Sequence, residues 1–196
     1  MTNGISRPAP HISRPDGAEV VHRGPVFTAH QWHQTLQDGS VRTFESLTRK
    51  DTVLVLPVTQ DRNLILIEEA QPSARTVLHA IGGGVEPGET ALQAAERELA
   101  EECGLRAGRY QLWWAWQPVN KIDWAVYVYL ATDLSTTEAG PEFDPGEKVR
   151  PQTFPLSSLT DFTLLDQLED RELEYLIGLT ATMPQRFANI RTALSW

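Results

Sequence analysis

Hydrophobic residues fall in short runs along the first third of the chain, separated by turn-forming residues, a pattern typical of β-strands. Two of these runs, Val53–Val58 and Leu64–Ile67, are almost continuously apolar, which predicts strands buried on both faces. Asp38–Gly39 lies between two earlier runs and favours a hairpin. We therefore predict strands at Val20–Val21, Val26–Leu36, Val41–Leu47, Val53–Val58 and Leu64–Ile67.

A helical pattern begins after residue 89. Thr90 and Gln93 have the spacing of a capping box, the pattern continues to about Glu102, and Gly104 is suited to end the helix. Helical periodicity places small and aliphatic residues on one face, which we expect to pack against the core. This predicted apolar stripe consists of Leu92, Ala95 and Leu99.

The second half of the chain continues with strands and ends with helices. We predict strands at Tyr110–Gln117 and Trp124–Ala131, a polar and acidic loop at Ser135–Lys148, and helices at Leu164–Leu179 and Phe187–Leu194. Strands, a central helix, more strands and terminal helices predict an α+β fold. We expect an α/β/α sandwich, in which helices flank a mixed β-sheet, with an N-terminal β extension.

We divide the chain into three segments. Residues 1–17 contain several prolines among small polar residues and are expected to form a flexible arm, with a binding role as the alternative. Residues 18–50 hold the N-terminal strands, and residues 51–196 hold the main domain.

Composition limits the classes of function. Of 196 residues, 41% are hydrophobic and 22% are charged, which is typical of a globular protein. The net charge of -9 makes nucleic-acid binding an unfavourable hypothesis, although a bound cation would still let the protein hold a small anion. No apolar run is long enough to span a membrane. The single cysteine, Cys103, excludes an intrachain disulfide and a cysteine zinc cluster, and it fits the cytoplasm.

The segment from Gly82 to Leu105 carries the candidate chemistry. Each residue turns a helix by about 100°, so Glu98, Glu101 and Glu102 lie within about 100° of one another. Arg97 is the segment's only base, and like charges at these spacings repel. Clustered carboxylates with so few basic partners favour Mg²⁺ or Mn²⁺. The alternative is a solvated acidic helix face.

Two further features of this segment support a site. Gly82-Gly-Gly84 is expected to be a loop in which the backbone closely approaches a phosphate or a metal ion. Glu89 precedes the helix and is expected to pair with Arg97, which would fix the loop against the helix.

The complete spacing resembles the Nudix box, Gly-x5-Glu-x7-Arg-Glu-aliphatic-x-Glu-Glu-x-Gly-aliphatic. Every fixed position is present between Gly83 and Leu105. The resemblance implies the Nudix fold and a pyrophosphatase that needs Mg²⁺, with Mn²⁺ as an alternative. It implies metal ligands at Glu98, Glu101, Glu102 and a carbonyl of Gly82 or Gly83.

Outside the box, the layout is similar to the ADP-ribose and nucleotide-sugar pyrophosphatase branch of that family. This resemblance implies a homodimer formed through the N-terminal strands. It also implies an additional glutamate from the acidic loop, with Glu147 preferred and Glu142 second, although either is nearly as well explained as a solvated loop acid. The catalytic set expected from the resemblance is Glu101, Glu102 and Glu147.

Substrate contacts are less well marked. Enzymes of that branch commonly carry arginines directly after the second core strand, whereas this chain has Glu68-Glu-Ala-Gln-Pro72 there and Arg75 only later. His79 lies where they commonly carry a glutamate. Trp114 and Trp116 share one strand face and offer rings for stacking on a base or sugar, with core packing as the alternative. The candidate substrate contacts are Arg75, His79, Trp114, Trp116 and Glu142.

The resemblance implies hydrolysis of the diphosphate bond in a nucleoside diphosphate linked to a group X, such as ADP-ribose or a nucleotide sugar. The products would be a nucleoside monophosphate and phosphorylated X. Two alternatives stay open: a housecleaning hydrolase of nucleoside triphosphates or dinucleoside polyphosphates, and a Nudix-fold binding module without activity. We expect a small-molecule substrate and neither a nucleic-acid nor a membrane partner.

Overall fold

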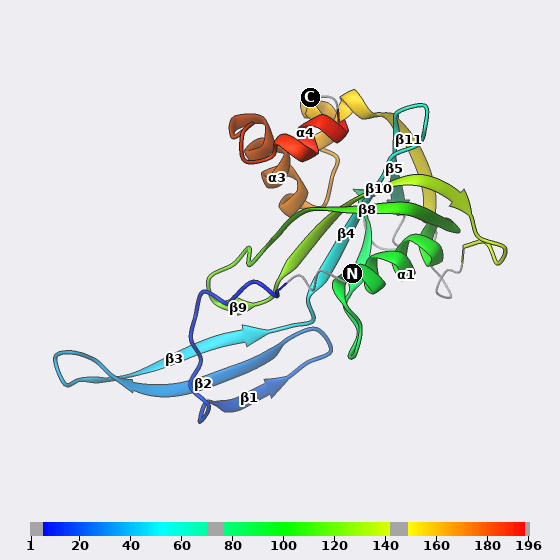
Figure 1. The fold of residues 1–196 in the computed structure, drawn as a ribbon. Coiled ribbons are helices and arrows are strands. Elements are labelled where there is room, and N and C mark those ends of the chain that lie inside the picture. Colours follow the sequence, from blue (N-terminus) through cyan, green and yellow to red (C-terminus); the bar gives the residue numbers. More distant parts are fainter. Residues whose placement is uncertain (1–5, 70–76, 142–148, 195–196) are drawn as a thin grey trace. The chain divides into compact units, whose positions relative to one another are not determined.

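The computed structural model describes residues 6–69, 77–141 and 149–194 (Figure 1). Their contacts divide the chain into two units. The N-terminal unit runs up to Thr52 and includes Ala115–Val126, and the main unit consists of Val53–Trp114 and the chain from Tyr127 onward. Within the described residues, no helix is long and apolar enough to cross a membrane.

The N-terminal unit is built on a sheet with the strand order β1-β2-β3-β9. The predicted hairpin joins β2 and β3, with Gly39 at φ +80° and the Ser40 N–H donating to the Asp38 carboxylate over 2.9 Å. A positive φ suits glycine because it has no Cβ. The strands of this sheet are β1 (Glu19–Arg23), β2 (Thr28–Thr35), β3 (Val41–Thr48) and β9 (Ile122–Asp123).

The described part of the N-terminal arm makes specific contacts within this unit. The Arg7 guanidinium donates to both carboxylate oxygens of Asp51 over 2.7 and 2.8 Å, and to Asp123 over 2.7 Å. The Gln117 side-chain amide donates to the Pro8 carbonyl over 3.1 Å. The flexibility of residues 1–17 as a whole stays a prediction.

The main unit carries the other two sheets, with strand orders β7-β4-β10-β8 and β11-β5-β6. Residues Val53–Leu56 of β4 are at most 5% exposed, as the continuous apolar run predicted. The strands are β4 (Thr52–Pro57), β5 (Asn63–Glu69), β6 (Val77–His79), β7 (Ile81–Gly84), β8 (Leu105–Trp116), β10 (Val126–Thr136) and β11 (Val149–Pro155).

Helices flank these sheets, so the predicted α+β class is confirmed. In Figure 1, α1 lies on one side of the β7-β4-β10-β8 sheet, and α3 and α4 lie on the other. The helical elements are α1 (Ala91–Cys103), the 3₁₀ turn η1 (Leu156–Thr160), α2 (Phe162–Leu165), α3 (Arg171–Thr182) and α4 (Ala188–Leu194).

Two predicted elements were wrong. The expected loop Gly82-Gly-Gly84 belongs to an edge strand, β7, because the sheet next to α1 extends through the glycines. The expected single helix Leu164–Leu179 is broken between α2 and α3. At the break, the Leu78 N–H donates to the Gln167 carbonyl over 3.3 Å, so this segment pairs with β6 instead of continuing the helix.

Candidate active site

Helix α1 forms as its sequence predicts. The Thr90 hydroxyl accepts from the Gln93 N–H and the Gln93 side chain accepts from the Thr90 N–H, which together complete the capping box. Gly104 ends the helix at φ 63°, in the left-handed region that a C-terminal glycine adopts. The predicted apolar stripe is wrong at one position, since Leu92 is 39% exposed, whereas Ala94 is completely buried.

The burial of Glu98 is the central feature of the site. Glu98 is only 8% exposed, and its carboxylate lies against Gly83 of β7. A Cβ at position 83 would overlap the Glu98 carboxylate oxygens. The glycine therefore creates the space into which this acid projects, which explains why the strand beside α1 has no side chain here.

Glu102 approaches the same strand one helical turn later. Its carboxylate accepts a hydrogen bond from the Gly82 N–H over 3.2 Å. Residues four positions apart lie on one helix face, so Glu98 and Glu102 both point toward the glycine backbone. A Cβ at position 82 would collide with the Val53 carbonyl oxygen of the neighbouring strand β4. Both glycines thus permit a close approach that any other residue would obstruct.

Arg97 ties the acids and the strand together. Its guanidinium donates to Glu89 over 2.8 and 3.1 Å, to Glu98 over 2.7 Å and to Glu101 over 3.0 Å. It also donates to the Gly84 carbonyl over 2.9 Å. The Glu89–Arg97 pair suggested by the sequence is therefore present, and it connects the segment before α1 to the last residue of β7.

The surroundings shift the pKa of Glu98 and that of Glu89 in opposite directions. Burial raises the pKa of Glu98 above its ordinary value, and the hydrogen bond and charge of Arg97 oppose that shift only in part. The hydrogen bond from Arg97 lowers the pKa of Glu89. Glu98 is thus an acid whose surroundings, in the absence of a further cation, disfavour its charged form.

The oxygen atoms at this site are of the kind that bind a hard divalent cation. Glu98 and Glu102 offer carboxylate oxygens beside a glycine backbone, and the missing Cβ of Gly83 leaves a cradle there. Glu101 is more peripheral, with its side chain 44% exposed and held by Arg97. In the conformation shown by the described residues, no three acidic, histidine or cysteine side chains converge closely enough to hold a metal ion.

Comparison with known protein families identifies the family of this chain. The model of the NUDIX domain matches residues 48–176, which is more than half of the chain. The chain belongs to the Nudix family. Membership in this family of hydrolases implies a general requirement for a divalent metal ion.

Two characterised relatives are similar in sequence. An ADP-ribose pyrophosphatase of Bacillus subtilis (strain 168) is 27% identical over 161 residues, which cover 81% of this chain and 87% of the relative. The ADP compounds hydrolase NudE of Escherichia coli (strain K12) is 31% identical over 91 residues, covering 45% of this chain and 49% of that protein.

A solved structure supports the Nudix fold independently. The crystal structure of an ADP compounds hydrolase superposes with a TM-score of 0.71 and 23% sequence identity. The match covers 91% of this chain and 94% of that chain. At 23% identity, this likeness shows the fold alone.

Two of the predicted substrate contacts, His79 and Trp114, lie in the main unit of the Nudix chain. His79 lies with its Nε2 atom 3.3 Å from the Glu69 carboxylate across the β5–β6 pair. The Trp114 ring packs against Phe187 at 5.1 Å and beneath the Arg186 guanidinium at 4.1 Å. These contacts match the packing alternative for Trp114, and its role in substrate binding stays a prediction.

The other predicted contacts lie in the N-terminal unit or outside the described residues. Trp116 belongs to the N-terminal unit. Arg75, Glu142 and Glu147 lie outside the described residues, so their roles also stay predictions.

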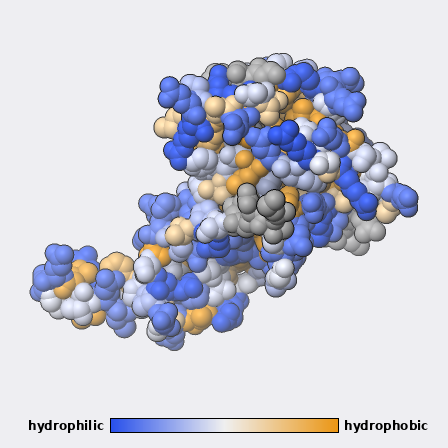
Figure 2. Space-filling model, in the orientation of Figure 1, coloured by the Kyte–Doolittle hydropathy of each residue, from blue (hydrophilic) through white to orange (hydrophobic). Residues whose placement is uncertain are grey.

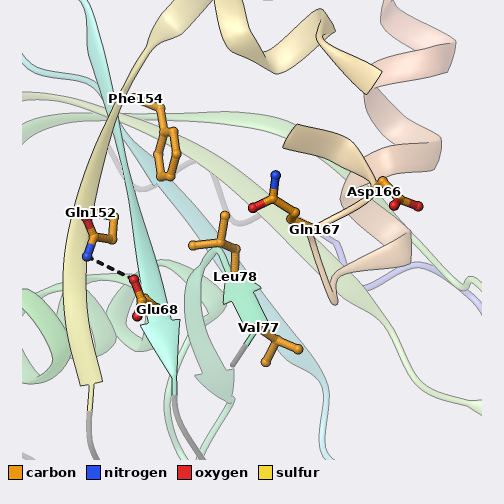
Figure 3. A pocket seen from close by; sticks show the side chains of 7 residues that line it. All are labelled: Glu68, Val77, Leu78, Gln152, Phe154, Asp166 and Gln167. Carbon is orange, nitrogen blue, oxygen red and sulfur yellow. Dashed lines mark hydrogen bonds between the residues drawn. The ribbon is translucent and has the colours of Figure 1, made fainter. Parts of the chain in front are cut away.

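A cavity of about 380 Å³ is lined by residues of β5, β6 and β11 and of the segment after α2 (Figure 3). Glu68 and Gln152 form one side, where the Gln152 amide donates to the Glu68 carboxylate over 3.0 Å, and Leu78 and Phe154 project into the hollow. None of its described lining residues is basic. The described lining therefore offers amide donors but no cationic side chain to an anion.

Asp170 is an acid that the sequence analysis did not single out. Its carboxylate accepts from the Ala80 N–H over 2.6 Å, between β6 and β7. Burial raises the pKa of Asp170 to about 6, although the Ala80 N–H and the charge of His79 act in the opposite direction.

The raised pKa of Asp170 predicts a pH-dependent stability. The folded protein holds the Asp170 proton more tightly than the unfolded chain, so the free energy of unfolding should fall as pH rises through about 4 to 6. The decrease from this group should be at most about 3 kcal/mol, since one pKa unit corresponds to about 1.4 kcal/mol. Denaturant unfolding of the natural protein and Asp170→Asn between pH 4 and 7.5 measures it. Parallel stability curves for the two proteins would contradict the prediction.

Proposed function

We propose that this chain is a divalent-metal-dependent Nudix hydrolase that cleaves the diphosphate bond of ADP-ribose or a related nucleoside diphosphate linked to X. The observation that carries the proposal is the placement of Glu98 and Glu102 against the glycines of β7 within an intact Nudix box. The similarity of this chain to an ADP-ribose pyrophosphatase, over most of both sequences, supports the choice of substrate class.

Glu98 and Glu102 are the first residues we assign to the metal, with Glu101 and a carbonyl of Gly82 or Gly83 as further ligands. A bound Mg²⁺ would supply Lewis-acid polarisation of the phosphate oxygens. Arg97 would keep Glu98 and Glu101 oriented, since it already bonds to both carboxylates. Mn²⁺ is the alternative ion, because it accepts the same hard oxygen ligands.

In the reaction, a water oxygen forms a new bond to one phosphorus while the bridging P–O bond breaks. The electron pair of the broken bond remains on the departing phosphate oxygen. A carboxylate takes the water proton, and we assign this role to Glu102 or to Glu147 of the acidic loop. The products are a nucleoside monophosphate and phosphorylated X, which are AMP and ribose 5-phosphate in the case of ADP-ribose.

A substrate screen tests this proposal. The purified protein is incubated with ADP-ribose, nucleotide sugars, nucleoside triphosphates and dinucleoside polyphosphates, each with Mg²⁺, with Mn²⁺ and with a chelator. We expect metal-dependent cleavage of ADP-ribose or a nucleotide sugar, with both monophosphate products identified by chromatography. Reaction in ¹⁸O-labelled water then shows which phosphorus is attacked, because the labelled oxygen appears in only one product.

The same screen separates the alternatives. Preferred cleavage of triphosphates or dinucleoside polyphosphates would replace the proposal with a housecleaning role. Tight binding of a nucleotide without metal-dependent cleavage of any substrate would favour a binding module. The intact carboxylates of the box argue against that last outcome.

For assembly, we propose a homodimer formed through the strands of residues 18–50, in the cytoplasm. These strands and their connections carry exposed apolar side chains, and Figure 2 shows hydrophobic patches among hydrophilic residues over the part of the surface formed by β1–β3 in Figure 1. Light scattering combined with size-exclusion chromatography measures the mass in solution. The exposed residues are Val20, Val21, Val26 and Val41.

A further inference from the structure

The segment between α2 and α3 pairs with β6 as a short parallel strand would. The Leu78 N–H donates to the Gln167 carbonyl over 3.3 Å, and the Glu169 N–H donates to the Leu78 carbonyl over 2.9 Å. Figure 3 shows Gln167 and Leu78 side by side at this junction. In a regular parallel ladder, the next bond would run from the Ala80 N–H to the Glu169 carbonyl.

Asp170 supplies that next bond with its side chain. The backbone turns into α3 at this point, and the Glu169 carbonyl instead accepts from the Arg171 N–H over 3.0 Å. The Asp170 carboxylate therefore takes the place of the ladder carbonyl and accepts from the Ala80 N–H over 2.6 Å. Ala80 is 4% exposed and Ile81 is completely buried, so water does not readily replace this acceptor.

The position of Asp170 on its own helix strengthens this interpretation. Asp170 is the N-cap residue of α3, a position at which aspartate commonly accepts from an N–H of the helix's first turn. Here the side chain makes no capping bond and reaches Ala80 instead. The carboxylate is committed to the β6–β7 connection, in preference to the local bond that its residue type favours.

We propose that Asp170 is a positioning residue for hydrolysis, holding Ala80 and thereby the strand that places Gly82 and Gly83 against Glu98 and Glu102. Ala80 lies two residues before Gly82 in the chain, and the Gly82 N–H is the donor to Glu102. A shift of the strand at Ala80 would move both glycines relative to the α1 carboxylates. The inference rests on the proposed function, because its catalytic consequence requires a hydrolase.

Matched substitutions separate the hydrogen bond from the charge. Asp170→Ala removes the acceptor, whereas Asp170→Asn retains an amide oxygen that can accept from the Ala80 N–H. Glu172→Ala removes a neighbouring acid of the first turn of α3 and serves as the control for charge. kcat, KM and the Mg²⁺ concentration for half-maximal rate are measured for each variant with the best substrate of the screen. The assays are run well below the melting temperature of every variant.

We expect Asp170→Ala to lower kcat about tenfold and to raise the half-saturating Mg²⁺ concentration, with a smaller change in KM, the size of effect known for residues that support a metal site. For Asp170→Asn and Glu172→Ala, kcat and the half-saturating Mg²⁺ concentration should stay within about threefold of the values of the natural protein. An Asp170→Ala variant that melts earlier but keeps its kcat and Mg²⁺ dependence would overturn the inference, because Asp170 would then be only structural.

Hydrogen–deuterium exchange of the peptide covering residues 78–84 provides a readout that does not depend on activity. We expect faster exchange in Asp170→Ala and natural protection in Asp170→Asn. If the natural protein cleaves no substrate, the proposed function fails, and the exchange result alone then decides whether Asp170 holds this strand. Unchanged exchange in Asp170→Ala would show that it does not.

Discussion

Replacing Glu98 with Gln is expected to lower metal-dependent hydrolysis about a thousandfold, a loss of about 4 kcal/mol of transition-state stabilisation. Glu98 lies deepest among the candidate ligands, and the amide would keep its shape and its hydrogen bond from Arg97 while losing the negative charge. Glu102→Gln should have a similar effect, because Glu102 approaches the same glycine strand one turn later. Initial rates over a range of Mg²⁺ concentrations measure both variants.

The Glu98→Gln variant should lose activity without losing thermal stability. Burial raises the pKa of Glu98, which means that its charged form is unfavourable in the folded protein without a further cation. A neutral isostere removes this cost, so the melting temperature without metal should stay the same or rise. Such opposite effects are typical of functional residues and not of structural ones.

Glu96→Gln is the matched control for these variants. Glu96 also lies on α1, so the same change from glutamate to glutamine can be made there. Its side chain is exposed and is not among the acids that accept hydrogen bonds from Arg97. Its activity should be unchanged. Full metal-dependent activity in Glu98→Gln or Glu102→Gln would refute the assignment of these carboxylates to the reaction.

Local sequence signals predicted the elements that depend on local physics. The capping box of Thr90 and Gln93 and the left-handed Gly104 fixed both ends of α1, because these bonds are made within a few residues. The Asp38–Gly39 hairpin formed for the same reason. The spacing of the box likewise brought Glu98 and Glu102 to one face, since the helical repeat alone determines that relation.

Features that depend on distant partners were not predictable from one sequence. Three consecutive glycines suggested a loop, but they are tolerated in β7 because α1 and β4 approach that strand closely. The apolar periodicity of residues 164–179 suggested one helix, yet pairing of the Gln167 region with β6 interrupts it. Asp170 gave no local signal, since its partner Ala80 is 90 residues away in the chain.

Gly83→Ala is expected to lower kcat about a hundredfold, the loss associated with moving a catalytic group by about 1 Å. The new Cβ would occupy the space of the Glu98 carboxylate oxygens. That carboxylate is the end of a flexible side chain, so we expect it to move while the strand keeps its place. The fold should therefore survive, with a loss of about 1–3 kcal/mol in the free energy of unfolding.

Two other glycines make this test specific to the site. At Gly82 a Cβ would meet the Val53 carbonyl and the Leu54 backbone, which cannot move independently of β4, so Gly82→Ala should impair folding itself. At Gly178 of α3 a Cβ would meet nothing within 4 Å, so Gly178→Ala should keep full activity and gain about 1 kcal/mol of stability from helix propensity. Denaturant unfolding and Mg²⁺-dependent rates distinguish the three outcomes. A Gly83→Ala variant with natural kcat and natural Mg²⁺ dependence would show that the Glu98 carboxylate does not need its place against β7 for the reaction.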